Sequence, residues 1–132
     1  MPVALEIVSP DKLLLSQPVD MVVIPAWEGD MGVLPGHAPA IVMLRGGVIN
    51  LYQGDQITDR LYVSGGFAEV TPERCTVLAN EARPVAELTR AEAEQRMGAA
   101  VLAFETASRE DTAAQEAGMD LIQAAQAMAD AI

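Results

Sequence analysis

Few residues in this 132-residue sequence have the chemistry for proton transfer, nucleophilic attack or metal binding. The single histidine, His37, lies in the turn-forming residues 34–39 and lacks a serine and an acid placed as in a hydrolase, so we expect it to hydrogen-bond the loop backbone. The single cysteine, Cys75, should share a strand face with Val77 and Ala79, which predicts a buried and unreactive thiol. One cysteine also excludes an internal disulfide framework and a multi-thiolate zinc site.

Three further places in the chain contain residue types that occur in binding sites. Residues 29–32, Gly-Asp-Met-Gly, lack the spacing of a phosphate-binding loop, so we interpret them as a turn with a solvated acid. Glu92 and Glu94 lie two residues apart and would diverge around a helix, which argues against a shared metal site. Trp27 lies in a predicted loop, where it either contacts a partner or folds over the end of the sheet. The residues therefore predict no catalytic or metal site and favour a binding or assembly role.

The amino-acid composition argues against several classes of binding partner. Eight Lys and Arg residues against 19 Asp and Glu give a formal charge of -11, which argues against nucleic acid and against docking on anionic lipid. The chain is 51% hydrophobic, so it is not a disordered acidic segment. No apolar run approaches the roughly 20 residues of a membrane span, and we expect no direct membrane insertion. The N-terminal residues do not resemble a signal peptide, which predicts a cytoplasmic location.

The elements that would position these residues change character near residue 82. Eight of the ten glycines and seven of the eight prolines precede it, and they separate short apolar runs at regular intervals. This spacing predicts an antiparallel β-sandwich or barrel, because no helical stretch lies between the runs. Strands are expected at residues 5–8, 19–24, 41–44, 48–52, 60–64, 67–70 and 75–79.

After Pro84 the sequence predicts two helices. Thr89 and Glu92 have the spacing of a capping box, and residues 108–111 interrupt the pattern and can cap a second helix. Alanine-rich stripes should let the two helices pack closely as an antiparallel hairpin, which Gly118 is expected to weaken. We therefore predict a β domain over residues 1–82 and a helical hairpin over residues 88–132. The predicted stripes are Ala93, Met97, Val101 and Phe104 in the first helix, and Leu121, Ile122, Ala125, Met128, Ala129 and Ile132 in the second.

Longer motifs in the chain resemble the epsilon subunit of the bacterial F-type ATP synthase. Residues 29–39 (GDMGVLPGHAP) and residues 63–70 (VSGGFAEV) match that family, and residues 5–10 (LEIVSP) and 76–79 (TVLA) fit it as well. The motifs occur in the family's order and spacing, and the resemblance covers the whole chain. It implies a ten-stranded antiparallel β-sandwich followed by a two-helix hairpin.

The resemblance also implies a function. A member of this family is a non-catalytic part of the rotating central stalk, which binds the gamma subunit and the ring of membrane-embedded c subunits. Proton flow turns the ring, and the stalk drives ATP synthesis on other chains. The expected location is peripheral, at the cytoplasmic face of the inner membrane. In many members the hairpin extends toward the alpha and beta subunits of the catalytic head and inhibits ATP hydrolysis.

Specific residues acquire roles from this resemblance. The family's c-ring contact falls in the loop of residues 28–32, with Asp30 at its acidic position. We expect interface residues at Trp27, Glu28, Asp30, Met31 and His37.

The family's nucleotide-binding motif is altered here. It reads Ile or Leu, Asp, two variable residues, Arg and Ala, and residues 86–91 (AELTRA) match it only in part. Arg90 and Ala91 are retained, Glu87 replaces the aspartate, and Glu81 matches an upstream acid.

One helical repeat later, Met97 replaces an arginine, and Arg96 is expected on another face of the helix. These departures predict weak or absent ATP binding, and residues 89–91 are otherwise simply the start of a helix.

Two other classes remain open from the sequence. One is an adapter β-domain of an unrelated cytoplasmic complex, without affinity for gamma or the c-ring. The other is a small-ligand-binding β-barrel, which would need an unfilled interior. The hairpin is expected to stay folded against the sandwich and to inhibit weakly, because the tail has no Lys or Arg after Arg109.

Overall fold

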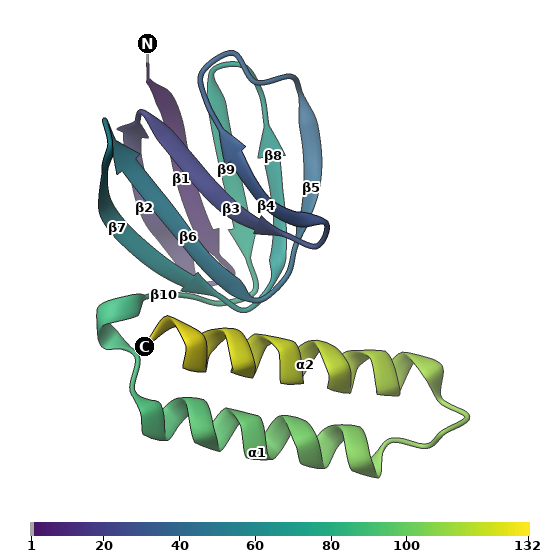
Figure 1. The fold of residues 1–132 in the computed structure, drawn as a ribbon. Coiled ribbons are helices and arrows are strands. Elements are labelled where there is room, and N and C mark those ends of the chain that lie inside the picture. The colour runs from purple at the N-terminus through teal and green to yellow at the C-terminus, as the bar shows by residue number, and fades with distance from the viewer. Residues whose placement is uncertain (1) are drawn as a thin grey trace.

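The protein is a β-sandwich that stands on a helical hairpin, in a computed structural model that describes residues 2–132 (Figure 1). This arrangement confirms the predicted ten-stranded sandwich followed by two helices. The elements are β1 (Val3–Ser9), β2 (Lys12–Val19), β3 (Met21–Ala26), β4 (Gly29–Val33), β5 (Ala40–Leu44), β6 (Gly47–Gln53), β7 (Gln56–Val63), β8 (Gly66–Val70), β9 (Arg74–Ala79), β10 (Ala82–Pro84), the 3-10 helix η1 (Val85–Glu87), α1 (Arg90–Thr106) and α2 (Thr112–Ala131).

The strands follow one another in the order β10-β7-β6-β3-β5-β8-β9-β1-β2, and β4 pairs with β3. Figure 1 shows β3, β4, β6 and β7 as a layer in front of β1, β2 and β9. Strands β3 and β5 are joined only by the pair Ala26 and Leu44, where the sheet passes from one layer to the other. Strands β1 and β9 run parallel, whereas the other pairings within residues 2–132 are antiparallel.

Residues 29–32 form strand β4, so their interpretation as a turn was wrong. The turn lies at Trp27 and Glu28, and β4 returns along β3 with Gly29 opposite Ala26 and Val33 opposite Val22. Val33 is fully buried and anchors the end of the strand in the core. Two glycines and an aspartate form a strand here because the backbone ladder to β3 and one buried valine hold them.

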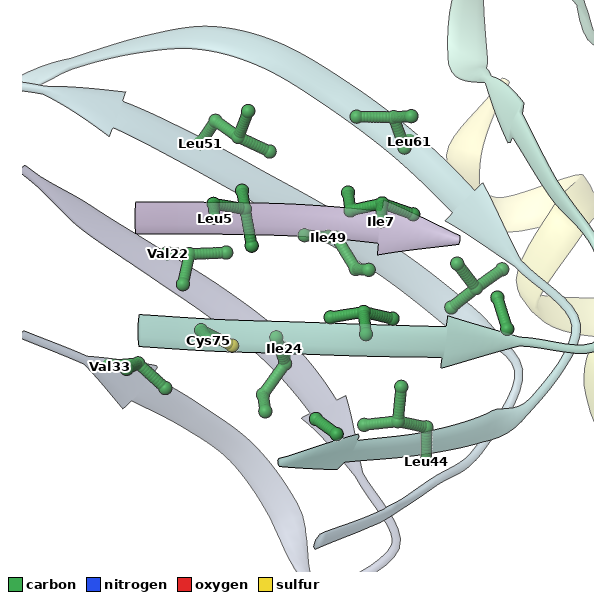
Figure 2. Close-up of a cluster of buried hydrophobic side chains, with 14 of the residues drawn as sticks. Leu5, Ile7, Val22, Ile24, Val33, Leu44, Ile49, Leu51, Leu61 and Cys75 are labelled. Carbon is green, nitrogen blue, oxygen red and sulfur yellow. The ribbon is translucent and has the colours of Figure 1, made fainter. Parts of the chain in front are cut away.

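The core is built by the inward-facing side chains of both layers. Alternate residues of β1 (Val3, Leu5 and Ile7) are fully buried, as period-two alternation requires. Figure 2 shows aliphatic side chains from several strands meeting in this interior, with the Cys75 sulfur among them. Burial raises the pKa of Cys75 to about 11, which confirms the predicted buried thiol. A filled aliphatic interior also speaks against the ligand-binding barrel.

Both helices begin where the capping residues predict. The Thr89 hydroxyl accepts a hydrogen bond from the Glu92 amide at 3.2 Å, and α1 follows. A carboxylate oxygen of Asp111 accepts from the Ala114 amide at 3.0 Å, and α2 follows. The Glu92 side chain does not return to Thr89, as a capping box would require, but binds Arg83.

The predicted helix stripes are only partly correct. In α1 the fully buried residues are Ala93 and Ala100, whereas Val101 and Phe104 are each 36% exposed. The far end of the hairpin extends beyond the sandwich in Figure 1, so side chains there have less to pack against. In α2 the buried residues include Ala125 and Met128 as predicted, together with Ala124 and Ala131, but Leu121 and Ile132 are exposed.

Gly118 has a packing role that the sequence did not reveal. It is buried in α2, and a Cβ atom at this position would lie 2.8 Å from the Cα of Phe104 in α1. The glycine therefore permits the close approach of the two helices, which compensates for its low helix propensity.

Candidate interaction surfaces

The β3–β4 turn presents Trp27 and Glu28 to solvent. Trp27 is 48% exposed, and its backbone amide donates to the Met43 carbonyl at 3.1 Å. Its side chain and Met31 line a groove of about 820 Å³ between β4 and β5, which Ile41 and Met43 also line. The turn thus combines an anchored backbone with an exposed aromatic side chain, an arrangement suited to contact with another protein.

Asp30 forms an ion pair that its sequence context does not indicate. One of its carboxylate oxygens accepts from Nη2 of Arg45 at 2.6 Å, and Nε of Arg45 donates to the Ala26 carbonyl at 3.1 Å. Asp30 nevertheless remains largely exposed. The charge at the predicted acidic position is therefore partly neutralised within the chain, and a basic partner has to compete with Arg45.

His37 lies at the opposite end of β4 from this turn, in the loop that leads to β5. Its Nδ1 donates to the Ala38 carbonyl at 2.7 Å, and its backbone amide donates to the Leu34 carbonyl at 3.1 Å. The predicted hydrogen bond to the loop backbone is confirmed. The five predicted interface residues are thus divided by the length of one strand, with Trp27, Glu28, Asp30 and Met31 toward one end and His37 at the other.

A second surface crosses the outer face of the other layer. We call it the outer apolar row and define it as Leu13, Val8, Leu78, Phe67 and Met43, which are paired in register across β2, β1, β9, β8 and β5. Four of these side chains are at least 37% exposed, and Val8 is half-buried. Ile41, two residues from Met43 on the same face of β5, is 75% exposed.

The sequence held a signal for this row. Strands β5, β8 and β9 alternate, but one outward position in each carries a large apolar residue, Met43, Phe67 or Leu78, where a polar residue is usual. A row of exposed apolar side chains across five strands is typical of a protein–protein interface.

The hairpin is docked on the end of the sandwich through α2. The Tyr62 hydroxyl, from β7, donates to the Ala124 carbonyl at 2.8 Å. The Gly46 amide donates to Oε1 of Gln123 at 2.8 Å, and Nε2 of Gln123 donates back to the Gly46 carbonyl at 2.6 Å. Tyr62 is fully buried together with Met128, and burial raises the pKa of Tyr62 to about 12. In this structure the hairpin is folded against the sandwich, as expected.

Helix α1 is attached by a network of charges. Both terminal nitrogens of Arg96 donate to the carboxylate of Glu81, one of them at 2.6 Å, and Nη2 also approaches Glu92 at 3.4 Å. Arg83 pairs with the same Glu92. The hydrogen bond from Arg96 is the largest influence on Glu81 and lowers the pKa of that carboxyl. Although Arg96 does not take the position of Met97 on the helix, α1 turns its side chain toward the sandwich, where it pairs with Glu81.

The residues of the altered nucleotide motif are brought together only in part, because Glu81 and Glu87 line one pocket of about 430 Å³. A hollow of about 630 Å³ between hairpin and sandwich is lined by Tyr62, Glu81 and Arg96, among others, but not by the other motif residues. Glu87, Arg90 and Ala91 are exposed at the start of the helical region. Only Glu81 of the predicted set faces the hollow, and Arg96 already occupies its carboxylate.

Neither a membrane-spanning helix nor a clustered metal site is found among the described residues. None of the helices in residues 2–132 is long and apolar enough to span a bilayer. The same residues contain no group of three or more His, Cys, Asp or Glu side chains that could hold a metal ion.

The sequence of this chain matches a known protein family. Residues 2–85 match the model of the ATP synthase, Delta/Epsilon chain, beta-sandwich domain. The chain belongs to this family. An ATP synthase epsilon chain from Granulibacter bethesdensis is 64% identical over 128 residues, covering 97% of this chain and 95% of the relative. Another, from Paramagnetospirillum magneticum, is 49% identical over 127 residues, covering 96% and 94%.

Solved structures of ATP synthases contain the same fold as this family member. A chain of the Euglena gracilis mitochondrial ATP synthase superposes with a TM-score of 0.79 at 24% identity, covering 98% of this chain and 81% of that one. A chain of the Tetrahymena thermophila mitochondrial ATP synthase central stalk and c-ring gives a TM-score of 0.69 at 10% identity, covering 99% and 96%. At these identities the likeness supports the fold.

Proposed function

We propose that this chain is a non-catalytic subunit of the central stalk of the F-type ATP synthase, which couples rotation of the c-ring to ATP synthesis through the gamma subunit. The outer apolar row carries this proposal. Its exposed Met43, Phe67 and Leu78 side chains lie on a stiff, filled sandwich, and a rotor needs such a contact to transmit torque without slipping. The chain would be peripheral, at the cytoplasmic face of the bacterial inner membrane.

The gamma subunit is the partner we assign to the outer apolar row. Burial of apolar surface contributes roughly 25 cal/mol per Å², so several such side chains supply a large share of a stable interface. Charge repels this acidic chain from anionic partners, but a contact made by apolar side chains avoids that repulsion.

The c-ring is the partner we assign to the β3–β4 turn. Trp27 offers an aromatic anchor, and Asp30 offers a carboxylate that a basic ring loop can share with Arg45. His37 and the loop that contains it lie at the other end of β4, so they would meet a different part of the stalk.

Regulation by the hairpin is proposed to be weak. The docked state is held by Tyr62, Gln123 and the Arg96 network. The tail beyond Arg109 carries acids and no Lys or Arg, so it would be repelled by an acidic surface on the catalytic head. ATP binding is proposed to be weak or absent, because Arg96 is engaged by Glu81.

Co-purification with the gamma subunit tests the proposal. The full chain should retain purified gamma, and Phe67→Lys in the outer apolar row should release it, because a buried unpaired charge is costly in an interface. Ile57→Lys is the matched control, since Ile57 is 46% exposed on β7 in the other layer. Failure of the unaltered chain to bind gamma would overturn the proposed function.

A further inference from the structure

The short connection between β5 and β6 contacts both the β3–β4 turn and helix α2. On the turn side, Arg45 donates from its backbone to the Pro25 carbonyl at 2.9 Å, from Nε to the Ala26 carbonyl and from Nη2 to Asp30. On the helix side, the next residue, Gly46, exchanges two hydrogen bonds with the Gln123 amide. Two surfaces far apart in the sequence therefore meet at consecutive residues.

Close packing fixes the position of this connection. A Cβ atom at Gly46 would lie 2.5 Å from the Cα of Ala124, so backbone meets backbone there. A Cβ atom at Gly47 would lie 2.6 Å from the Cβ of Pro25, so the turn strand holds the connection on its other side. A shift of a few tenths of an ångström in residues 45–47 would therefore disturb both contacts.

We infer that residues 45–47 couple the β3–β4 turn to docking of the hairpin. Breaking the ion pair between Asp30 and Arg45 therefore weakens the packing of α2 against the sandwich. While Asp30 is paired with Arg45, three hydrogen bonds hold Arg45 in place. They thereby also fix the neighbouring Gly46 peptide, which is hydrogen-bonded to the Gln123 side chain. A cationic loop of a partner that pairs with Asp30 removes one of these three hydrogen bonds. This last step rests on the proposed function, whereas the coupling is a property of the chain alone.

The coupling has to be reciprocal. If the Asp30–Arg45 pair strengthens the seat of α2, then a docked α2 strengthens the Asp30–Arg45 pair by the same factor. Arg45 also lines a groove with Asp130 of α2, and a released Arg45 that paired there would tighten docking instead. The sign of the effect therefore distinguishes the two arrangements.

Amide hydrogen exchange in the isolated full chain tests this inference. The Gly46 amide donates to Gln123, so its exchange rate reports how often α2 lifts from its seat. Asp30→Asn should raise that rate about threefold, as expected for loss of an exposed ion pair. Glu28→Gln is the matched control: it removes the same charge from the same turn, and within residues 2–132 the Glu28 side chain has no hydrogen bond or ion pair. It should leave the rate unchanged.

The reciprocal variant is Gln123→Met, which should speed exchange of the Arg45 Nε–H. Unchanged exchange of the β1 amides in each variant would show that the sandwich remains folded. An unchanged or slower Gly46 rate in Asp30→Asn, or an unchanged Arg45 Nε–H in Gln123→Met, would overturn the coupling. Because no partner is present, this result does not depend on binding to gamma, and either proposal can fail alone.

Discussion

Glu81 and Arg96 face each other across the junction between sandwich and α1, with both terminal nitrogens of the guanidinium on the carboxylate. Paired donors and acceptors of this kind form the stronger class of ion pair, and they also fix the orientation of both groups. Each side chain is about one-third exposed, so solvent reduces the strength of the pair. The pair attaches α1 to the sandwich and keeps Arg96 from other anions.

Replacement of Glu81 should make hairpin attachment less stable and less sensitive to acid. Arg96 lowers the folded-state pKa of Glu81 below its ordinary value of 4.5, so the stabilising contribution is present above pH 4.5 and is lost as the pH falls below it. Glu81→Gln should therefore destabilise the chain at pH 7, by up to about 1 kcal/mol, and by less at pH 3. Thermal melting of both proteins at the two pH values measures this difference.

The control for that experiment is Glu94→Gln, which removes an exposed acid from the same helix. It should leave the melting temperature within error at both pH values. An equal loss in the two variants would mean that net charge, and not the pair with Arg96, sets the stability.

The isolated chain should bind ATP weakly, if at all. Glu81 holds Arg96, and Glu87, Arg90 and Ala91 lie outside the hollow beside them. A phosphate would have to displace Glu81 from Arg96 before it could bind there. Calorimetry at millimolar ATP should give little heat, and affinity in the low micromolar range would contradict this expectation.

The sandwich alone should bind gamma nearly as tightly as the full chain. The outer apolar row lies on β5, β8, β9, β1 and β2, whereas α2 contacts β6 and β7. A chain that ends after residue 87 keeps β10 and every residue of the row. Pull-down with purified gamma measures the two affinities side by side, and loss of binding in the shortened chain would assign the contact to the hairpin.

Changes at the β3–β4 turn should reduce coupling between ATP hydrolysis and proton pumping. Trp27→Ala removes the exposed aromatic side chain, and Asp30→Lys places a like charge against any basic ring loop, at a cost of about 1 kcal/mol or more for each close pair. Protons pumped per ATP hydrolysed in membranes should fall in the double variant.

Asp30→Lys also places a lysine beside Arg45, so a local effect on the fold has to be separated from a lost contact. Arg45→Gln supplies that control, because it breaks the ion pair and leaves the Asp30 carboxylate free for a partner. Full coupling in the double variant would remove the turn from the c-ring interface.

Deletion of residues 88–132 should change ATP hydrolysis by the complex only slightly. Gln123 and Tyr62 hold the hairpin against the sandwich. Its acidic tail would be repelled by an acidic surface on the catalytic head, at about 1 kcal/mol per close pair of charges and less at high salt. Hydrolysis rates of the intact and deleted complexes at two salt concentrations measure the effect. A many-fold activation on deletion would show that the tail inhibits through contacts that do not depend on its charge.

Local patterns were enough to predict most of the sandwich. Short apolar runs marked seven strands, and the turn residues between them marked their ends. Strand β4 was missed because its glycines and aspartate have the composition of a turn, and β2 because Leu13, Leu14 and Leu15 do not alternate. These strands depend on pairing with neighbours, which a short window of sequence does not contain.

The interaction surfaces were harder to predict, for the same reason. Asp30 lies on β4 and Arg45 in the connection between β5 and β6, whereas Glu81 lies on a loop and Arg96 on α1, so only the tertiary fold brings each pair together. Gly118 appeared to be a weak point of α2 because its contact with Phe104 depends on how the helices cross. Capping by Thr89 was predictable because it needs only three neighbouring residues.

The parallel pairing of β1 with β9 sets the order in which the domain can be completed. Ala4 lies opposite Arg74, so the first strand of the chain finds its second neighbour only after nearly the whole sandwich has been synthesised. During translation the β1–β2 ribbon therefore keeps one strand edge unpaired until β9 has been synthesised. Long-range strand pairing of this kind slows folding. The helical hairpin is the last part to be synthesised, and it can be seated only on a sandwich that has already closed.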